Sequence, residues 1–531
     1  MTSLDSTYAK PFLTVPEQAR RLRERGMDCS TASFASGILE RYGYYRLSGY
    51  WHLYRARPTP PEPQLDDDGR EIRLDSFVDG TSLAHVVALY DFDHELRTRL
   101  NDMLSSIETS FRFFIGHRLG RAGTFAHRCP ETLGAVHDPE PGAVPEPTAA
   151  YREWLEEYDR HERRARDVFV LHFREKYGPH LPIWVATEVM SFGVLSNLYT
   201  LMPQVDQEIL AARFQVHTAD GRGDRGALAN WLNNLRNVRN ICAHYGRLWN
   251  RTFDVLIDAP GQARKGAGDT HLACLADTGV NNKLYGVVLI MRHLLLSIAP
   301  GRTDVVDLVD FIESRSLGLR FSMGQLGFPT DWRSSPVWDR GFRIDSAPML
   351  AANLLDQTES LTAAKTRAAL VDVEFEATGT PPPSEQAGRA RKRAQRQLLR
   401  TYRHFGVVLE VEIGGAKYYP AFQFRDGKII DALAEVNKFL SDTCVGAQPV
   451  HVTAALLDWW QTPHPRLPQQ TDGSCQSPLD LLNSVSEACF TRITEETGAL
   501  TSFAVQLMAD SPVPAHESAS AMSEPVSTIN H

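Results

Sequence analysis

The chain has 531 residues, of which 43% are hydrophobic, and its formal net charge is -9 at pH 7. This length is ample for a core and suggests two to four domains. Because the net charge is negative, the surface as a whole cannot bind nucleic acid through positive charge, so any RNA must be held in a local groove. The seven cysteines lack a C-x-x-C pair, which argues against a disulfide framework and a structural zinc site. No apolar run suggests a signal peptide or a membrane partner, and we expect a cytoplasmic protein.

Helical periodicity dominates the first two thirds of the chain. Residues 81–120 predict one long amphipathic helix, on which Glu108 and Arg112 stand one turn apart as an intrahelical pair or as part of a cleft. The aromatic cluster from Tyr42 to Tyr54 is expected in the core rather than as a base-stacking platform. Arg41, Arg46 and Arg55 are candidates for lining an RNA groove, although surface arginines are more often plain solubilising charges. Further helices are expected at 1–60, 151–200, 205–215, 228–250 and 281–298, interrupted by loops at 58–69 and 128–150.

One predicted helix, 228–250, carries the most informative motif. Arg239, Asn240 and His244 form an R-N-x-x-x-H arrangement. On a helical wheel one side is apolar and the other is polar. The apolar stripe contains Leu235, Val238, Cys242, Tyr245 and Trp249. The polar stripe contains Asn233, Arg236, Asn240, His244, Arg247 and Arg251, with Arg239 on its flank.

Such a polar face suits phosphodiester chemistry at neutral pH, because imidazole can carry a proton and guanidinium can hold phosphate oxygens. Asn240 stands one turn before His244 and can fix the orientation of its ring. The competing interpretation is a solvated helix face, but lysine and glutamate, the usual residues of such a face, are absent from this run. Looser Arg-spacer-His pairs elsewhere, at 112–117 and 166–172, lack an asparagine after the arginine.

With its flanks, the motif resembles the HEPN-type ribonuclease signature, and specifically the abortive-infection (Abi-like, AbiD/AbiF) proteins of bacterial phage defence. The resemblance covers roughly residues 1–340. Five further segments of the chain resemble the family, in the same order along the sequence. They are residues 10–14 and 18–22; residues 41–51; residues 90–93, 96–97, 107–108 and Arg112; residues 181–184, Glu188 and 191–193; and residues 327–329, 331–332 and Trp338.

The resemblance implies a metal-independent endoribonuclease that needs no cofactor. Two helical protomers would pair so that their motifs face one cleft, giving a homodimer with a composite site. His244 would act as acid or base, Arg239 would hold the non-bridging phosphate oxygens, and Asn240 would orient the ring or bind phosphate. Arg236, Arg247 and Arg251 are the expected RNA-binding residues. The expected products carry a 2′,3′-cyclic phosphate and a 5′-hydroxyl.

A different kind of sequence begins at about residues 340–350. A proline break at 381–384 precedes a basic helix at 389–400, and residues 407–413 and 417–419 predict a hairpin that turns at two glycines. The later blocks 460–463 and 478–482 resemble the C-terminal part of Xre/ParS-type antitoxins, although 353–405 shows no clear helix-turn-helix.

The expected fold class is mostly α: a HEPN-like helical bundle followed by a smaller α+β C-terminal domain. The expected divisions are an Abi-like ribonuclease domain (1–345), an antitoxin-like α+β domain (346–505) and a disordered tail (506–531). The antitoxin-like module would hold the nuclease in check, or recruit RNA, DNA or a phage-derived trigger.

The predicted function is an endoribonuclease effector, or toxin, of abortive infection with RNA as substrate. An antitoxin protein or a small RNA is a possible further partner. Two alternatives stay open: a noncatalytic RNA-binding regulator on the same fold, and a DNA-binding regulator led by the C-terminal domain.

Overall fold

The structure, a computed structural model, describes most of the chain between residues 11 and 510. The described ranges are 11–58, 64–65, 71–137, 146–219, 222–264, 270–344, 360–369, 385–413, 416–425, 428–443, 449–470 and 474–510. The expected domain boundary near 345 and the two glycines of the hairpin lie outside them.

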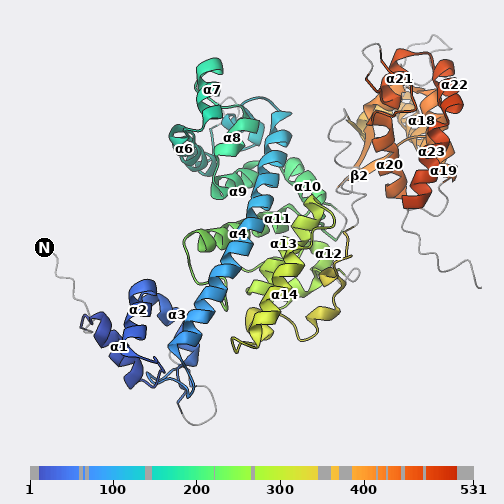
Figure 1. Cartoon of the computed structure of the whole chain (residues 1–531). Coiled ribbons are helices and arrows are strands. Elements are labelled where there is room, and N and C mark those ends of the chain that lie inside the picture. The colour runs from blue at the N-terminus through green and yellow to red at the C-terminus, as the bar shows by residue number, and fades with distance from the viewer. Residues whose placement is uncertain are drawn as a thin grey trace, which may run out of the picture.

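The first part of the chain, up to residue 344, is helical (Figure 1). Its α-helices are α1 (Val15–Glu24), α2 (Ala32–Tyr42), α3 (Tyr44–Trp51), α4 (Leu83–Gly120), α5 (Pro130–Leu133), α6 (Ala149–Arg164), α7 (Val168–Tyr177), α8 (Ile183–Val189), α9 (Phe192–Leu201), α10 (Gln204–Arg213), α11 (Arg225–Ala243), α12 (Gly261–Arg264), α13 (Leu284–Ile298) and α14 (Asp304–Ser316). Short 3₁₀ helices lie between them: η1 (His52–Tyr54), η2 (Ala126–Arg128), η3 (Ala273–Ala276), η4 (Met323–Leu326), η5 (Trp332–Ser334) and η6 (Pro336–Trp338).

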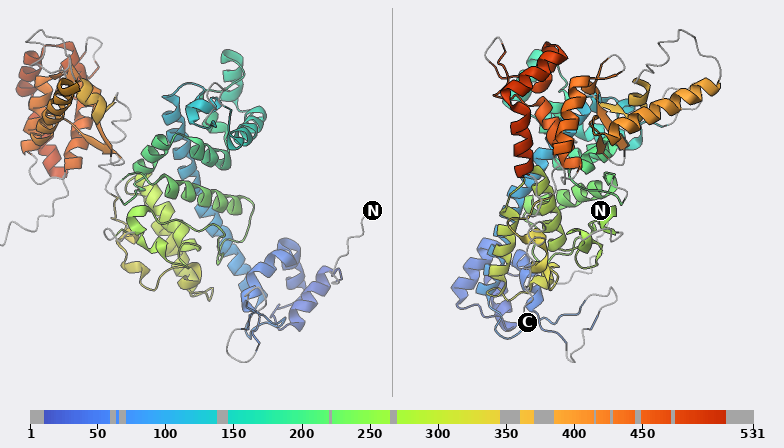
Figure 2. Two further views of the ribbon diagram at one scale, coloured as in Figure 1. Left: turned by 180° about the vertical axis from the view of Figure 1, so that it is seen from behind. Right: turned by 90° about the vertical axis from the view of Figure 1, so that its right-hand side faces the viewer.

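Helix α4 is the axis of this part, as two further views show (Figure 2). Ser82 begins it by accepting a hydrogen bond from the His85 backbone N–H at 3.2 Å, a standard N-cap. Apolar side chains at helical spacing along its length are buried against α3, α8, α11, α13 and α14. The prediction of one long helix at 81–120 is confirmed, since the helix spans Leu83–Gly120.

Helix α11 is shorter than predicted: it ends at Ala243 and not at 250. Tyr245 has φ 56°, and the Tyr245 and Gly246 N–H groups donate to the carbonyls of Cys242 and Ile241 at 3.2 and 2.8 Å. This is the Schellman pattern that closes a helix with a left-handed residue. The chain therefore leaves the helix directly after His244, and Arg247 and Arg251 do not share its polar face.

The C-terminal part combines helices with short antiparallel strands. Its elements are β1 (Ser360–Thr362), α16 (Ala363–Ala369), α18 (Glu385–His404), β2 (Val411–Ile413), β3 (Ala416–Pro420), η7 (Ala421–Gln423), β4 (Phe424–Arg425), β5 (Lys428–Ile429), α19 (Asp431–Thr443), α20 (Pro449–Gln461), α21 (Pro478–Ser484), α22 (Glu487–Thr497) and α23 (Ala499–Asp510).

Strand order in the three-stranded sheet is β1-β3-β2, with Val411 opposite Tyr418 and Ile413 opposite Ala416. The predicted hairpin and the basic helix, α18, are thus confirmed. The expected fold class, mostly α with a smaller α+β part, is also confirmed. Because α23 runs to Asp510, the tail expected from residue 506 begins inside a helix. The apolar residues of α23 pack against α19 and α20, and the helix continues to Asp510 before the Ser- and Ala-rich sequence begins.

His127 and His293 are buried in the described helical part, and the half-buried His271 packs against His293. Burial lowers the pKa of His127 to about 3, of His271 to about 4 and of His293 to about 3. His271 and His293 contact each other at 3.1 Å between ring nitrogens, and His293 hydrogen-bonds the Phe214 carbonyl oxygen at 2.7 Å. These groups stay neutral in the fold at pH values where an unfolded chain protonates its imidazoles.

We therefore expect acid to destabilise the fold between about pH 6.5, the usual pKa of histidine, and about pH 4, the lowered pKa of His271. In this window the unfolded state binds more protons than the folded state, so the free energy of unfolding falls as the pH falls. Each such histidine contributes up to about 1.4 kcal/mol per pH unit. Thermal unfolding at pH 7.5, 6.5, 5.5 and 4.5 measures the slope. The variant His127→Phe keeps a ring against Tyr158 and should lower the slope, whereas an unchanged slope would contradict the assignment.

Candidate functional site

The three motif residues lie at the C-terminal end of α11. His244 follows the last helical residue, and its backbone N–H donates to the Asn240 carbonyl at 2.9 Å. His244 and Asn240 are exposed, and the Arg239 side chain is 37% exposed. The imidazole and the guanidinium are therefore both accessible from solvent and not sealed in the core.

The helix is held so that this end faces outward. The Asp224 side chain caps its first turn by accepting from the Ala227 N–H at 3.0 Å, and it also accepts from the Gly261 N–H at 2.8 Å. Leu235, Val238 and Cys242 are buried, as the predicted apolar stripe requires. Tyr245, expected in that stripe, is 61% exposed because the chain has turned out of the helix before it.

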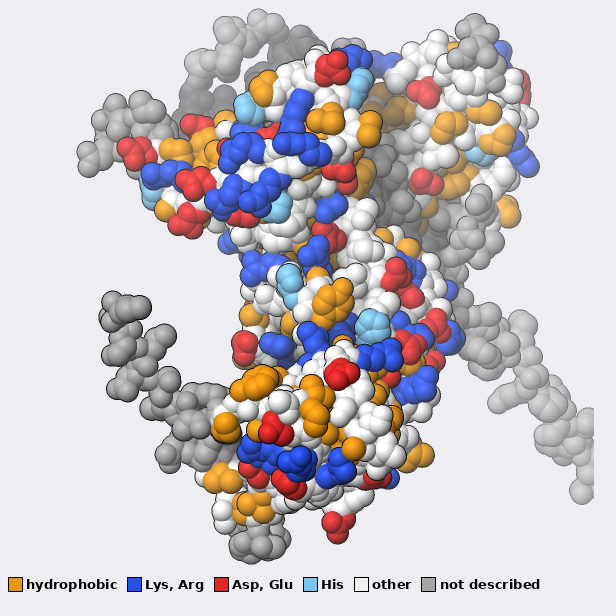
Figure 3. All heavy atoms as spheres, turned by 60° about the vertical axis from the view of Figure 1, so that its left-hand side comes forward, with side chains coloured by type: hydrophobic (Ala, Val, Ile, Leu, Met, Phe, Trp, Pro, Cys, Tyr) orange, Lys and Arg blue, Asp and Glu red, His pale blue; other side chains and the backbone are white. Residues whose placement is uncertain are grey.

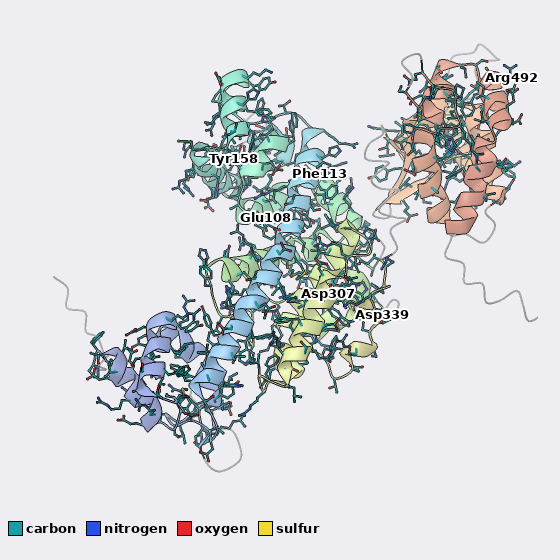
Figure 4. All side chains as sticks on the ribbon, viewed as in Figure 1. Glu108, Phe113, Tyr158, Asp307, Asp339 and Arg492 are labelled. Carbon is teal, nitrogen blue, oxygen red and sulfur yellow. The ribbon has the colours of Figure 1, made fainter. Side chains whose placement is uncertain are left out.

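Arg239 has an acidic neighbour on α4. Its Nε lies 3.8 Å from a carboxylate oxygen of the buried Glu108, labelled in Figure 4. Glu108 also pairs with Arg112 at 2.6 Å, and Arg112 donates to the Met190 carbonyl oxygen at 2.9 Å. The predicted intrahelical pair of Glu108 and Arg112 is confirmed. The same carboxylate also lies near Arg239, whose side chain stays partly exposed.

A groove of about 330 Å³ separates the end of α11 from α4, and we call it the α4–α11 groove. It is lined by His94, Arg97, Thr98, Asn101, Arg239, Cys242, Ala243 and Tyr245. Burial raises the pKa of the Cys242 thiol to about 12, so this cysteine stays protonated and is no nucleophile at neutral pH.

Three polar residues of this groove escaped the sequence analysis: His94, Thr98 and Asn101. All three are exposed. Their spacing of four and three residues places them on one face of α4, a signal that could have been found in the sequence. A second imidazole, His94, thus lines the same groove as Arg239.

The turn that follows His244 is fixed by a buried carboxylate. Asp93 accepts from the Leu248 N–H at 3.2 Å, from the Trp249 N–H at 2.7 Å and from the Tyr50 hydroxyl at 2.6 Å. It also forms an ion pair with Arg97 one turn later on α4. Burial raises the pKa of Asp93, and the Arg97 charge and the N–H and O–H donors oppose that shift. The network joins α3, α4 and the segment after the motif.

Arginines complete the turn by donating to its carbonyl groups. Arg46 on α3 donates to the Tyr245 carbonyl oxygen at 3.1 Å, and Arg97 donates to that of Gly246 at 3.2 Å. In the other direction, Arg247 donates to the Gly49 carbonyl oxygen on α3. Arg46 and Arg247, considered for RNA contact on sequence grounds, therefore also tie the turn to α3.

The other predicted residues are placed less favourably. Arg236 lies one turn before Arg239, partly buried, and donates to the Asn233 side-chain oxygen at 2.5 Å. Arg251 is partly exposed beyond the turn. Among the described residues, no side-chain hydrogen bond joins Asn240 to His244. The structure therefore shows no contact through which Asn240 would orient the His244 ring.

In the described part of the chain, His, Cys, Asp and Glu side chains nowhere gather in threes in a way that could hold a metal ion. Among the helices that the structure describes, none has the length and apolarity needed to cross a membrane.

Part of the chain matches a known protein family. Residues 37–250 match the family model described as Abi-like protein. A comparison with curated proteins and with solved structures found no match. The matched segment begins inside α2 and contains α3, α4 and α11, and so it contains both walls of the α4–α11 groove and the turn after His244. Over residues 37–250, the chain is therefore similar to Abi-like proteins.

Proposed function

We propose that this chain is a metal-independent endoribonuclease of the HEPN type, acting in the cytoplasm as an effector of bacterial abortive infection. One observation carries the proposal. The exposed His244 directly follows α11, and five residues earlier the partly exposed Arg239 lines a groove that holds further polar side chains. The match of residues 37–250 to the Abi-like family model supports the setting in phage defence.

The proposed reaction is attack of an RNA 2′-hydroxyl on the adjacent phosphorus. His244 removes the hydroxyl proton, Arg239 binds the non-bridging oxygens as negative charge develops, and the exposed Asn240 amide donates to the phosphate. A phosphate entering the groove would compete with Glu108 for Arg239. Because their separation is 3.8 Å, longer than a direct hydrogen bond, the guanidinium keeps donors for a ligand.

Cleavage also needs a group that gives a proton to the leaving 5′-oxygen. In the proposed homodimer a second copy supplies it, so that two motifs face one cleft. Sedimentation of the active protein at twice the chain mass of 59.4 kDa would support this arrangement. An active protein of single-chain mass would refute it. The proton donor would then be sought on the same chain, where His94 lines the groove with Arg239.

The experiment that tests the function separates cutting from binding. The full-length chain is incubated with RNA in the presence of EDTA, and cleavage and complex formation are followed on parallel gels. The proposal predicts new RNA fragments despite the chelator. RNA that is bound and stays intact would favour the noncatalytic RNA-binding regulator instead.

We further propose that the chain is divided near residue 345, with an antitoxin-like unit at 346–505. Two observations support the division. The hydrophobic cluster of the helical part draws its residues from 19–338, and the two clusters of the C-terminal part draw theirs from 399–504. Limited proteolysis should cut first between these parts and leave two resistant fragments. Initial cuts inside α4 or α20 would contradict the division.

A further inference from the structure

A second groove lies on the N-terminal helices, and we call it the N-terminal groove. It has a volume of about 600 Å³, within the range of roughly 300–1,000 Å³ typical of ligand sites. Its lining comes from the segment before α1, from α1, from α3 and from the loops that follow α3: Pro11, Phe12, Leu13, Gln18, Arg21, Arg25, Tyr44, Tyr45, Ser48, Arg55 and Asp75. Hydrophobic and basic side chains lie side by side on this lowest lobe of the molecule (Figure 3).

Aromatic rings of this groove stand in solvent, contrary to the expectation that the Tyr42–Tyr54 cluster belongs to the core. Tyr50 and Trp51 are buried as expected, but Tyr45 is 76% exposed and Phe12 is 89% exposed. The ring of Tyr44 contacts the ring of Tyr45 edge to face, with ring centroids 5.6 Å apart. An exposed ring braced by a second ring offers a flat apolar surface to a planar ligand.

The charge of the groove is positive although the chain as a whole carries -9. Three arginines line it, and Asp75 is the one acidic residue among its described lining residues. Asp75 is shared by Arg25 at 2.6 Å and Arg55 at 3.3 Å. The surplus of guanidinium over carboxylate favours an anionic ligand, and Arg21 on α1 is the arginine not engaged by Asp75.

Helix α3 links this groove to the candidate active site. Tyr45 and Ser48 face the N-terminal groove, while their neighbours Arg46 and Gly49 contact the turn after His244. Successive residues of a helix point about 100° apart, so the two sites lie on adjacent faces of one helix. The distance between them is on the order of a helix diameter, about 10 Å.

From these observations we infer that the N-terminal groove binds unpaired nucleotides of the RNA substrate, next to the bond that is cut. A base stacks on Tyr45 or Phe12, and Arg21 together with Arg25 holds a backbone phosphate. Aromatic faces with nearby guanidinium groups are the usual means by which proteins hold single strands without reading their sequence. The inference deepens the proposed ribonuclease function and rests on it.

Binding of a short RNA that cannot be cut tests the groove separately from catalysis. The probe is a fluorescent single-stranded oligonucleotide with 2′-O-methyl groups, which lacks the attacking hydroxyl. Its Kd is measured by anisotropy for the full-length wild type, for Tyr45→Ala and for Arg21→Ala. The matched control is Tyr177→Ala, a tyrosine with 62% exposure on α7.

We expect Tyr45→Ala to weaken binding on the order of 10-fold, and we expect Arg21→Ala to weaken it and to reduce its salt dependence. Tyr177→Ala should bind like the wild type, and a duplex of the same sequence should compete poorly. Equal Kd values for Tyr45→Ala, Arg21→Ala and the control would overturn the groove assignment, as would a wild type that does not bind the probe. Neither result depends on whether RNA is cut, so failure of the groove is distinguishable from failure of the nuclease.

Discussion

Replacing His244 by alanine should lower the rate of RNA cleavage by about 10²–10⁴-fold, the usual contribution of a positioned acid-base group. The ring is exposed at the end of α11, so its removal leaves the packed core intact. Arg239→Ala should cost about 10²–10³-fold, because the developing charge on the phosphate loses its guanidinium. Both rates are measured in single-turnover assays with the full-length chain.

Matched controls keep this result specific. His172 is another exposed histidine, and Arg99 pairs with Glu95 at 2.6 Å on the side of α4 that faces Phe311. His172→Ala and Arg99→Ala should cleave at close to the wild-type rate. All four variants should melt near the wild-type Tm. If His244→Ala cut RNA as fast as the His172 control, the imidazole would have no part in the reaction.

Asp93→Ala should be the most damaging single substitution outside the groove. It removes the acceptor of the Leu248 and Trp249 N–H groups and leaves Arg97 buried without its ion-pair partner. Removing one partner of a buried ion pair typically destabilises a protein by about 3–5 kcal/mol. We expect a fall in Tm of roughly 10 °C. Cleavage should fall as well, since the turn that positions His244 is released.

Two further variants test whether the loss of stability in Asp93→Ala comes from the hydrogen-bond and ion-pair network around Asp93. Asp91 lies on the same helix two residues earlier, and its exposed side chain lies 3.5 Å from the Tyr42 hydroxyl. Asp91→Ala should change the free energy of unfolding by less than about 0.5 kcal/mol. The double variant Asp93→Ala/Arg97→Met removes the unpaired charge and should recover part of the lost stability. A double variant less stable than Asp93→Ala would show that Arg97 stabilises the fold without its partner.

The sequence predicts the helices that present the site because their apolar residues recur over many turns. Periodicity places α4 within two residues of its observed start, and it identifies the buried face of α11 through Leu235, Val238 and Cys242. The motif itself needs only local spacing. Arg239, Asn240 and His244 are brought to one exposed helix end, as their positions in the sequence suggest.

What the sequence does not predict depends on contacts between distant segments. The hydrogen bonds from Leu248 and Trp249 to Asp93 join residues 155 and 156 positions apart. The early end of α11 requires Tyr245 to adopt the left-handed backbone conformation, which residues other than glycine seldom adopt. This turn is stabilised by Arg46 and Arg97, which donate hydrogen bonds to its carbonyl groups. The residues next to Tyr245 in the sequence give no indication of these contacts.

The chemistry of the newly formed RNA ends tests the central claim most directly. Fragments produced by the full-length chain in the presence of EDTA are analysed for their terminal groups, with His244→Ala in parallel. A 2′,3′-cyclic phosphate opposite a 5′-hydroxyl, formed by the wild type and lost in the variant, is the predicted result. Fragments with a 3′-hydroxyl and a 5′-phosphate, or cyclic phosphate ends that form equally well without the imidazole, would contradict it.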